Sequence, residues 1–174
     1  LKKTNYSKFN YTIYVGSLCG MFRNNLLDFK YQSFLKPNIK YVKYYKNKLE
    51  KINHFPKIGI SWLSKRLDLG SDKSIELEEL LPIFKIKNLS FINLQYGNYS
   101  KTINLFNKKH KLNIIDIPKL DKLNDIERLL GLISSVDLVL TVSNTTAHLS
   151  GSIGKKTFLL APDNRAKLFY WMFS

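Results

Sequence analysis

Short apolar runs alternate with longer amphipathic segments along the chain from residue 57 onward. Runs of this length, rich in Ile, Val and Leu and bounded by polar turns, are typical of strands that are buried on both faces of a sheet. We expect strands in KIGISW, LSFINLQ, NIIDI, DLVLTVS and KTFLLAP, which begin at Lys57, Leu89, Asn113, Asp137 and Lys156.

The segments between these runs have the apolar spacing or the start signals of helices. We expect helices in residues 74–85, 99–110, 125–136 and 145–154, with Ser74 as the N-cap of the first. Strands that alternate with helices predict an α/β domain with a Rossmann-like parallel sheet and right-handed crossovers. Both the first strand and the strand at residues 138–142 should be buried in that sheet. Ligands of such sheets bind beyond the carboxyl ends of the strands.

Residues 1–55 are aromatic, basic and only weakly periodic. YTIYVGSL, at residues 11–18, predicts a strand, and NIKYVKYYKNKLEKI predicts a helix that starts at Pro37-Asn38. We therefore expect residues 1–55 to be the end of a preceding N-terminal domain with a linker, and residues 56–174 to be the ligand-binding domain. The chain begins with Leu and ends in the apolar FYWMFS, so we expect a fragment that is cut at both ends.

The chain is strongly basic, with 28 Lys and Arg against 13 Asp and Glu and a net charge of +15. Such a surplus favours an anionic partner: a phosphorylated substrate, nucleic acid or an anionic membrane surface. A general bias toward Lys, Asn and Ile explains the surplus equally well. The single cysteine, Cys19, and three widely spaced histidines predict neither a disulfide nor a metal site. No apolar run approaches the ~20 residues of a membrane-spanning helix.

The segment DLVLTVSNTTAHLSGSIG carries the most informative candidate site. A buried strand runs into Asn144, Thr145 and Thr146, and a helix follows at once. The first turn of a helix offers unpaired N–H groups and a partial positive charge, which together suit a phosphate. His148 lies one turn after Asn144, so the two can face the same side. Alternatively, Asn144 and the threonines only cap the helix, and His148 is a packed residue.

Two further strand ends carry polar candidates. After the first strand, a loop with Lys65, Arg66 and Lys73 could neutralise a pyrophosphate, or it could be a solvated basic loop. After the second strand, Gln95 could contact a base or ribose, or it could belong to a polar turn at Gly97-Asn98. The chain has no G-x-G-x-x-G, no P-loop and no G-x-S-x-G, so these signatures support no other active site.

In this order, the motifs resemble the C-terminal domain of glycosyltransferase family nine, the ADP-heptose:lipopolysaccharide heptosyltransferases. They are more similar still to the related domain that follows tetratricopeptide repeats in many bacterial proteins. That family shows GISW or GLAW, a basic loop before [RK]S[IL], SLQ, and then DLVI with [ST]VDT..AHLAGALGKPVWLLLP. The matching pieces here are GISW, KSI, NLQYG and DLVLTVSNTTAHLSGSIGKKTFLLAP, which begin at Gly59, Lys73, Asn93 and Asp137.

The resemblance implies the C-terminal half of a GT-B glycosyltransferase, which holds a nucleoside-diphosphate sugar and needs no metal or other cofactor. It implies donor contacts from Asn144, Thr145, Thr146 and His148. The residues implied to stabilise the departing diphosphate or to lie near the nucleoside are Lys65, Arg66, Lys73 and Gln95. The acceptor would be a bacterial surface glycan or glycolipid, and the protein would be cytoplasmic, with peripheral contact with the anionic inner membrane and no nucleic-acid partner.

Two features separate the chain from the family pattern. The family usually has Asp where we align Asn144, which puts donor choice and activity in question. Its general base belongs to an N-terminal domain that this sequence lacks, so no catalytic residue is assigned here and the fragment alone should be inactive. A catalytically inactive GT-B-like binding domain and, less favoured, a basic nucleic-acid-binding module are the alternatives.

Overall fold

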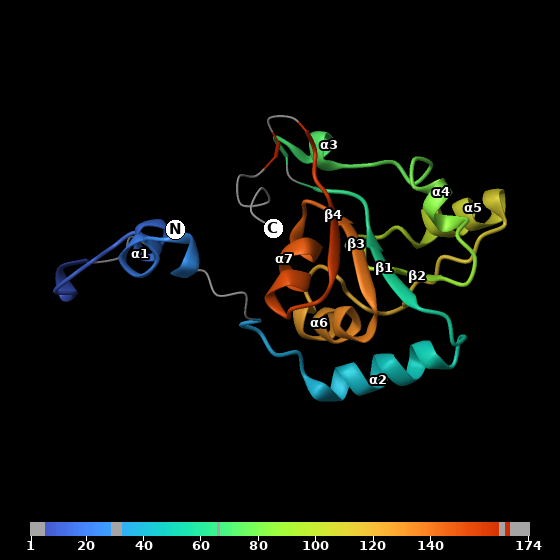
Figure 1. Cartoon of the computed structure of the whole chain (residues 1–174), viewed down its shortest axis with the longest axis horizontal. Coiled ribbons are helices and arrows are strands. Elements are labelled where there is room, and N and C mark those ends of the chain that lie inside the picture. Colours follow the sequence, from blue (N-terminus) through green and yellow to red (C-terminus); the bar gives the residue numbers. More distant parts are fainter. Residues whose placement is uncertain (1–5, 29–32, 66, 164–165, 168–174) are drawn as a thin grey trace. The chain divides into compact units, whose positions relative to one another are not determined.

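The computed structural model describes residues 6–28, 33–65, 67–163 and 166–167, and it comprises two compact units, Leu1–Gln32 and Ser33–Ser174. The first unit contains the 3₁₀ turns η1 (Tyr6–Lys8) and η2 (Leu26–Asp28) and the helix α1 (Val15–Phe22) (Figure 1). The predicted strand at residues 11–18 is therefore wrong. A strand needs a neighbour for its backbone hydrogen bonds, and the described part of this unit offers none, whereas a helix bonds within itself.

The second unit is built on a sheet of four strands that all run parallel. These strands are β1 (Lys57–Ser61), β2 (Ser90–Asn93), β3 (Leu138–Val142) and β4 (Thr157–Leu160), in the order β2-β1-β3-β4. Every residue of β1 is buried, and Val139 in β3 is 0% exposed. The structure thus confirms the predicted parallel α/β sheet and the burial of its two central strands, except for Leu138, which is partly buried.

The NIIDI run does not form a full strand. Ile115 makes one parallel bridge with Ile92, in which its N–H donates to Phe91 and its carbonyl accepts from Asn93, both at 2.8 Å. The run ends two residues later, and the next residue, Pro118, has no N–H to continue a ladder. An apolar run alone could not reveal how short the pairing is.

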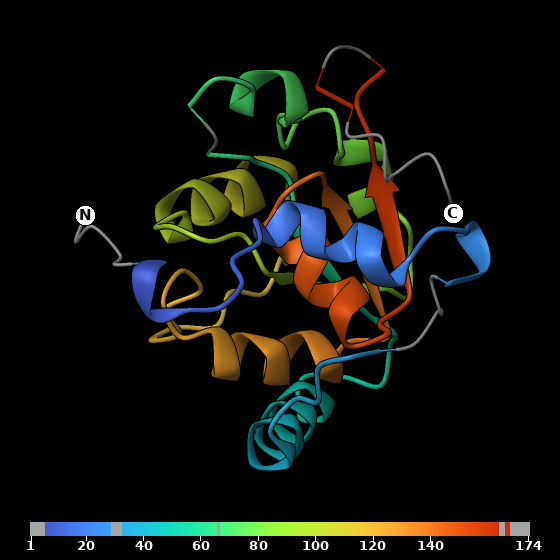
Figure 2. The ribbon, with the colours of Figure 1, turned by 90° about the vertical axis from the view of Figure 1, so that its left-hand side faces the viewer.

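Helices cover both faces of the sheet. The helices α2 (Ile39–Glu50), α6 (Ile126–Ser135) and α7 (Thr145–Ser152) contribute to an apolar cluster on one face, together with Val139. The helices α4 (Leu81–Phe84) and α5 (Ser100–His110) contribute to a second cluster on the other face, together with Leu140. Neighbouring residues of β3 thus point to opposite layers, as side chains on a strand must. Figures 1 and 2 show α6 and α2 on the same side of the sheet, next to one another.

Of the single helix predicted for residues 74–85, only the short α4 forms, and another short helix precedes the predicted segment. Helix α3 (Gly70–Lys73) ends at Ser74, so Ser74 is a C-cap rather than the predicted N-cap, and α4 starts only at Leu81. Pro82 explains the break, because inside a longer helix its ring would clash with the carbonyl four residues earlier. In the first turn of α4, its missing N–H has no consequence.

Helix α2 belongs to the compact unit, although we grouped its residues with the preceding segment. Its predicted start is confirmed: Asn38 is the N-cap and accepts from the N–H of Lys40. Tyr45 and Leu49 are buried against α6, where Gly131 faces Tyr41. A Cβ at residue 131 would lie 2.5 Å from the Tyr41 Cβ, so this glycine allows the two helices to approach closely.

We expect Gly131→Ala to lower the free energy of unfolding by about 1–3 kcal/mol, because the added methyl overpacks the contact between α2 and α6. Gly151→Ala is the matched control, since it also lies in a helix but a Cβ there meets nothing within 4 Å. That change should raise stability by about 0.4–1 kcal/mol. Urea unfolding of both variants measures the two effects, and equal shifts would contradict the proposed close approach.

Candidate functional site

A cavity of about 410 Å³ lies at the carboxyl ends of β1, β2 and β3. Its wall is formed by the loops that follow these strands, by the first turn of α7 and by the residues before and in α6. The lining residues are Ser64, Lys65, Lys73, Tyr96, Lys122, Leu123, Ile126, Leu129, Ser143, Asn144, Thr145, Thr146 and His148. Six of the eight predicted site residues are therefore brought together here.

Asn144 caps α7 and is fully engaged with the protein. Its Oδ1 accepts from the N–H groups of Thr146 (2.9 Å) and Ala147 (3.4 Å) and from the hydroxyl of Thr141 (3.1 Å). Its Nδ2 donates to Ser61 Oγ (2.7 Å) and to the carbonyl of Leu63 (3.0 Å). The capping role foreseen as an alternative is thus present, and it leaves this side chain no hydrogen for a ligand.

The first turn of α7 presents its remaining polar groups to the cavity. Thr145 is exposed, whereas the Thr146 side chain is 1% exposed and its hydroxyl has no partner among the described residues. Burying a hydroxyl without a partner is unfavourable by about 1–3 kcal/mol. His148 follows on the same turn, and burial and the nearby charge of Lys73 lower its pKa below the usual 6.5. Its imidazole is therefore neutral at pH 7, as α7's partial positive charge also favours.

Two predicted lysines line the cavity from the segment after β1. Lys73, in α3, is 4% exposed, and no described carboxylate forms an ion pair with it. The Lys65 ammonium lies 5.6 Å from the centre of the Tyr99 ring and close to Gly97, where a Cβ would come within 2.7 Å of Nζ. Arg66, the third predicted cation, lies outside the described residues.

Lys122 is a cavity residue that the sequence analysis missed. It is 8% exposed and pairs with Asp116 at 2.8 Å. Burial alone would raise the pKa of Asp116, but hydrogen bonds from Lys122, Ser100 and Asn93 hold that pKa below its usual value. Asp116 is the fourth of the five residues of the NIIDI run, so the rule that ligands bind near strand ends could have directed attention to this segment.

Gln95 does not line the cavity and is 0% exposed. Its Oε1 accepts from Ser61 Oγ (3.0 Å), the N–H of Trp62 (3.0 Å) and the N–H of Leu63 (2.8 Å). Its Nε2 donates to the carbonyls of Leu63 and Tyr96. In this structure Gln95 supports the loop after β1, whereas its neighbour Tyr96 lines the cavity.

The cavity wall combines cations with an apolar side. The described lining residues include three lysines and a histidine but no Asp or Glu, and Leu123, Ile126 and Leu129 form the apolar part. Helix α7 adds the partial positive charge of its N-terminus. Within the described residues, no group of three His, Cys, Asp or Glu side chains could hold a metal, and no helix is long and apolar enough to cross a membrane. The arrangement suits a ligand with a phosphate or diphosphate and a flat or apolar portion.

Comparison with known proteins supports the fold. The structure resembles that of the Escherichia coli ADP-heptose lipopolysaccharide heptosyltransferase II, with a TM-score of 0.54 and 12% identity, over 76% of this chain and 41% of that one. The fold is heptosyltransferase-like. The sequence is 29% identical to Protein FlbA of Caulobacter vibrioides over 158 residues, which are 90% of this chain. The chain spans about a quarter (26%) of the length of that curated relative. No family model matches the sequence.

The family pattern places the substituted position one residue earlier than we aligned it. In VDT..AHL the aspartate stands five residues before the histidine, and five residues before His148 is Ser143. Asn144 therefore corresponds to the pattern's threonine, which agrees with its observed role as the N-cap of α7. Ser143 lines the cavity.

We expect NMR titration to give His148 a pKa below 6.5 that rises when ADP is added. The diphosphate should offset the charge of Lys73, which helps to depress this pKa. Because the folded pKa lies below the unfolded one, the protein should lose stability as pH falls from about 6.5 toward the folded value. His148→Gln should remove that loss. His54 lies outside the cavity, and its resonances should not respond to ADP. A His148 pKa that ADP leaves unchanged would contradict a phosphate site beside it.

Proposed function

We propose that this domain binds a nucleoside-diphosphate sugar and is the donor-binding half of a glycosyltransferase. The observation that carries this proposal is the cavity of three lysines, without lining carboxylates, at the N-terminus of α7. The heptosyltransferase-like fold supports it, because the structural neighbour is named for an activated sugar nucleotide, ADP-heptose. Phosphate oxygens would accept from Lys65, Lys73 and the hydroxyl of Thr146, while the nucleoside would lie toward Tyr96 and the apolar wall.

The proposed reaction transfers the sugar to a glycan or glycolipid of the bacterial surface. An acceptor hydroxyl oxygen forms a bond to the anomeric carbon, and the bond from that carbon to the diphosphate breaks with its electron pair leaving on the diphosphate. The acceptor proton passes to a general base outside this chain. The contribution of the domain is to stabilise the charge that develops on the leaving diphosphate, which lowers the barrier.

The alternative is a binding domain of the same fold that does not catalyse transfer. It is motivated by Ser143, which stands where the pattern has a carboxylate. Both proposals require nucleotide binding, and they differ in turnover. Release of free nucleoside diphosphate from a nucleotide sugar by the protein would favour transfer, and binding without release would favour the alternative.

A nucleoside diphosphate should bind at least tenfold more tightly than its nucleoside, because the cavity offers cations and helix N–H groups to the phosphates. Calorimetry with ADP, UDP and GDP against adenosine, uridine and guanosine measures this. Lys73→Met should weaken diphosphate binding while leaving the melting temperature unchanged or higher, since no described carboxylate partner is lost.

Lys57→Met is the control for the general effect of replacing a buried lysine. Lys57 is also buried, but its ammonium donates to the carbonyls of Asn53 and Phe55. This variant should melt at a lower temperature and bind diphosphates normally. Equal affinity for nucleosides and diphosphates, or a Lys73→Met variant that is only less stable, would contradict the phosphate site.

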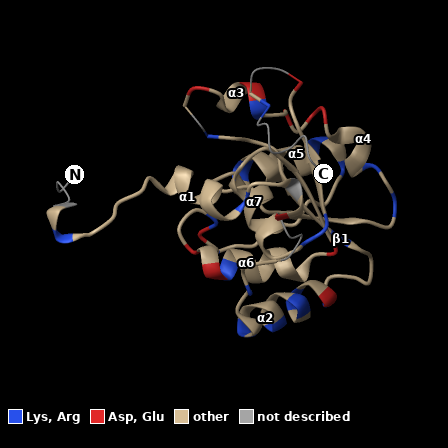
Figure 3. Ribbon diagram, turned by 60° about the vertical axis from the view of Figure 1, so that its left-hand side comes forward, with Lys and Arg blue, Asp and Glu red and all other residues tan. Residues whose placement is uncertain are grey.

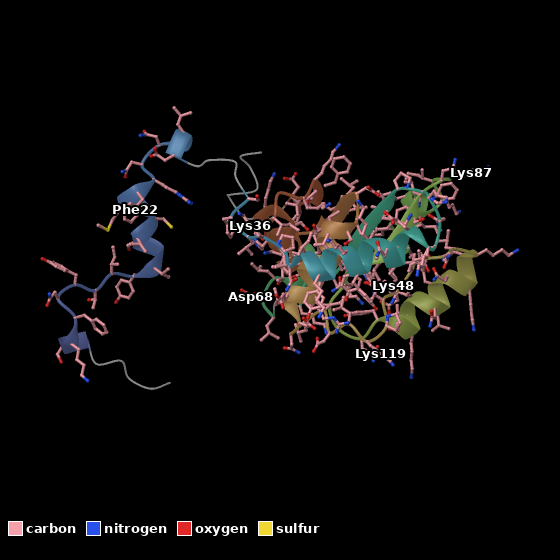
Figure 4. The ribbon with its side chains drawn as sticks, turned by 90° about the horizontal axis from the view of Figure 1, so that it is seen from below. Phe22, Lys36, Lys48, Asp68, Lys87 and Lys119 are labelled. Carbon is pink, nitrogen blue, oxygen red and sulfur yellow. The ribbon has the colours of Figure 1, made fainter. Side chains whose placement is uncertain are left out.

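We also propose peripheral contact with an anionic membrane through the outward face of α2. Five lysines and one acid, Glu50, lie in residues 39–51 (Figure 3). The exposed Tyr44 belongs to the same segment. Figure 4 looks onto this helix, with Lys48 labelled; its ammonium lies 5.9 Å from the Tyr44 ring centre. Lysines near such a surface contribute about 1 kcal/mol each.

Vesicles of phosphatidylcholine with phosphatidylglycerol should therefore bind the protein, and vesicles of phosphatidylcholine alone should not. The double change Lys43→Gln and Lys46→Gln should weaken binding by about 2 kcal/mol. The same change at Lys101 and Lys108, which are exposed on α5, is the charge-matched control and should have little effect. Equal losses in both variants would mean that net charge rather than the α2 face determines binding.

A further inference from the structure

Two buried side-chain amides connect the ends of β1, β2 and β3. Asn144, after β3, donates from Nδ2 to Ser61 Oγ at 2.7 Å. Ser61, at the end of β1, donates in turn to Oε1 of Gln95, after β2, at 3.0 Å. Asn144 is 6% exposed, Ser61 2% and Gln95 0%. The three strand ends are thus linked by a directed chain of hydrogen bonds that is shielded from water, where such bonds are strongest.

Both amides also hold the loop that follows β1. The carbonyl of Leu63 accepts from Asn144 Nδ2 (3.0 Å) and Gln95 Nε2 (3.3 Å), and its N–H donates to Gln95 Oε1 (2.8 Å). The next two residues, Ser64 and Lys65, line the cavity. Fixing Leu63 therefore fixes where the Lys65 backbone stands relative to the first turn of α7.

The position of Asn144 requires an amide rather than a carboxylate. On one side it must accept, because the N–H groups of Thr146 and Ala147 point at Oδ1. On the other side it must donate, because the Leu63 carbonyl has no hydrogen to offer. In the present structure Nδ2 lies 3.0 Å from the Leu63 carbonyl oxygen. An ionised aspartate would place a carboxylate oxygen there, so that two acceptors would face each other. The same reasoning applies to Gln95, which accepts from two backbone N–H groups and donates to two carbonyls.

We infer that Asn144 and Gln95 are positioning residues, which hold the Lys65 loop against α7 so that cations and helix N–H groups converge on one anionic ligand. Neither amide touches the ligand itself. The functional part of this inference rests on the proposed binding of a nucleoside diphosphate. It assigns to both residues a role different from the direct donor contacts that the family resemblance implies.

The test uses the near-isosteric changes Asn144→Asp and Gln95→Glu. Hydrogen exchange at pH 7.5 should be faster at the amides of Trp62, Leu63 and Ser64 in both variants than in the wild type. Affinity for ADP should fall by about ten- to a hundredfold, the usual effect of losing a buried hydrogen bond. In Asn144→Asp the ratio of variant to wild-type affinity should recover as pH falls from 8 to about 5, because a protonated carboxyl can donate again to Leu63. Asn144→Ala should show no such recovery.

Asn107→Asp is the matched control. Asn107 lies in α5 and does not line the cavity, but its amide likewise accepts from and donates to one backbone residue, Ile114, both at 2.9 Å. This variant should lose stability while keeping the ADP affinity and the exchange rates of residues 62–64. If Asn144 had a merely structural role, Asn144→Asp would likewise lose stability without changing the ADP affinity or the exchange rates of residues 62–64. A difference between the Asn144→Asp and Asn107→Asp variants in these two measurements therefore supports the positioning role.

The outcomes separate this inference from the proposed function. If the wild type binds none of ADP, UDP and GDP, the proposed function fails, and the exchange rates still decide whether the two amides hold the loop. Unchanged exchange at residues 62–64 in Asn144→Asp overturns the inference. Tighter binding of ADP-glucose but not of ADP by Asn144→Asp also overturns it, because the side chain would then contact the sugar.

Discussion

Parallel pairing of β1 with β2 and β3 is the constraint on which the candidate site depends. The register that aligns Ser61 with Thr141 brings the ends of these two strands together. Beyond the last rung of the ladder, the backbone groups of Trp62 and Leu63 have lost their strand partners, and burying them unpaired would be unfavourable. Gln95 and Asn144 supply those partners. The hydrogen bonds that satisfy these backbone groups also fix the positions of the Lys65 loop and of the start of α7.

The same strand ends bring positive charge to the cavity wall, and part of that charge has no described carboxylate partner. Lys122 is neutralised by Asp116, whose carboxylate also accepts from Asn93, Ser100 and the N–H of Ile117. Lys73 has no comparable described partner, and its field helps to keep His148 neutral. Together with the unpartnered hydroxyl of Thr146, these groups stabilise a folded chain less than apolar residues of the same size would. An anionic ligand could accept hydrogen bonds from both groups. Replacing either of them by an apolar residue should therefore raise the stability of the free protein and lower its affinity for the ligand.

Part of this arrangement follows from the sequence. Apolar runs located β1 and β3, because strands buried on both faces need continuous apolar residues. Asn144 before a helical segment indicated the cap of α7. The short bridge at Ile115 and the break at Pro82 were missed, since the length of a run does not reveal where backbone pairing ends. The role of Gln95 could not be predicted, because a polar residue at a strand end can face either the ligand or the backbone of the next loop. Its direction is decided by the unpaired groups of Trp62 and Leu63, which belong to another part of the sequence.

The contrast between Ser143 and Asn144 shows where this chain departs from the heptosyltransferase pattern. Where that pattern has Asp-Thr, this chain has Ser143 and Asn144, and Asn144 caps α7 with its side-chain amide. An amide can cap the helix and at the same time donate to Leu63, which a threonine hydroxyl with one hydrogen could do only in part. The wall that would face a diphosphate has three lysines and the N-terminus of α7, and Ser143 beside them carries no charge. If the cavity binds an activated sugar, the difference should therefore concern the sugar that is recognised more than the phosphates that hold it.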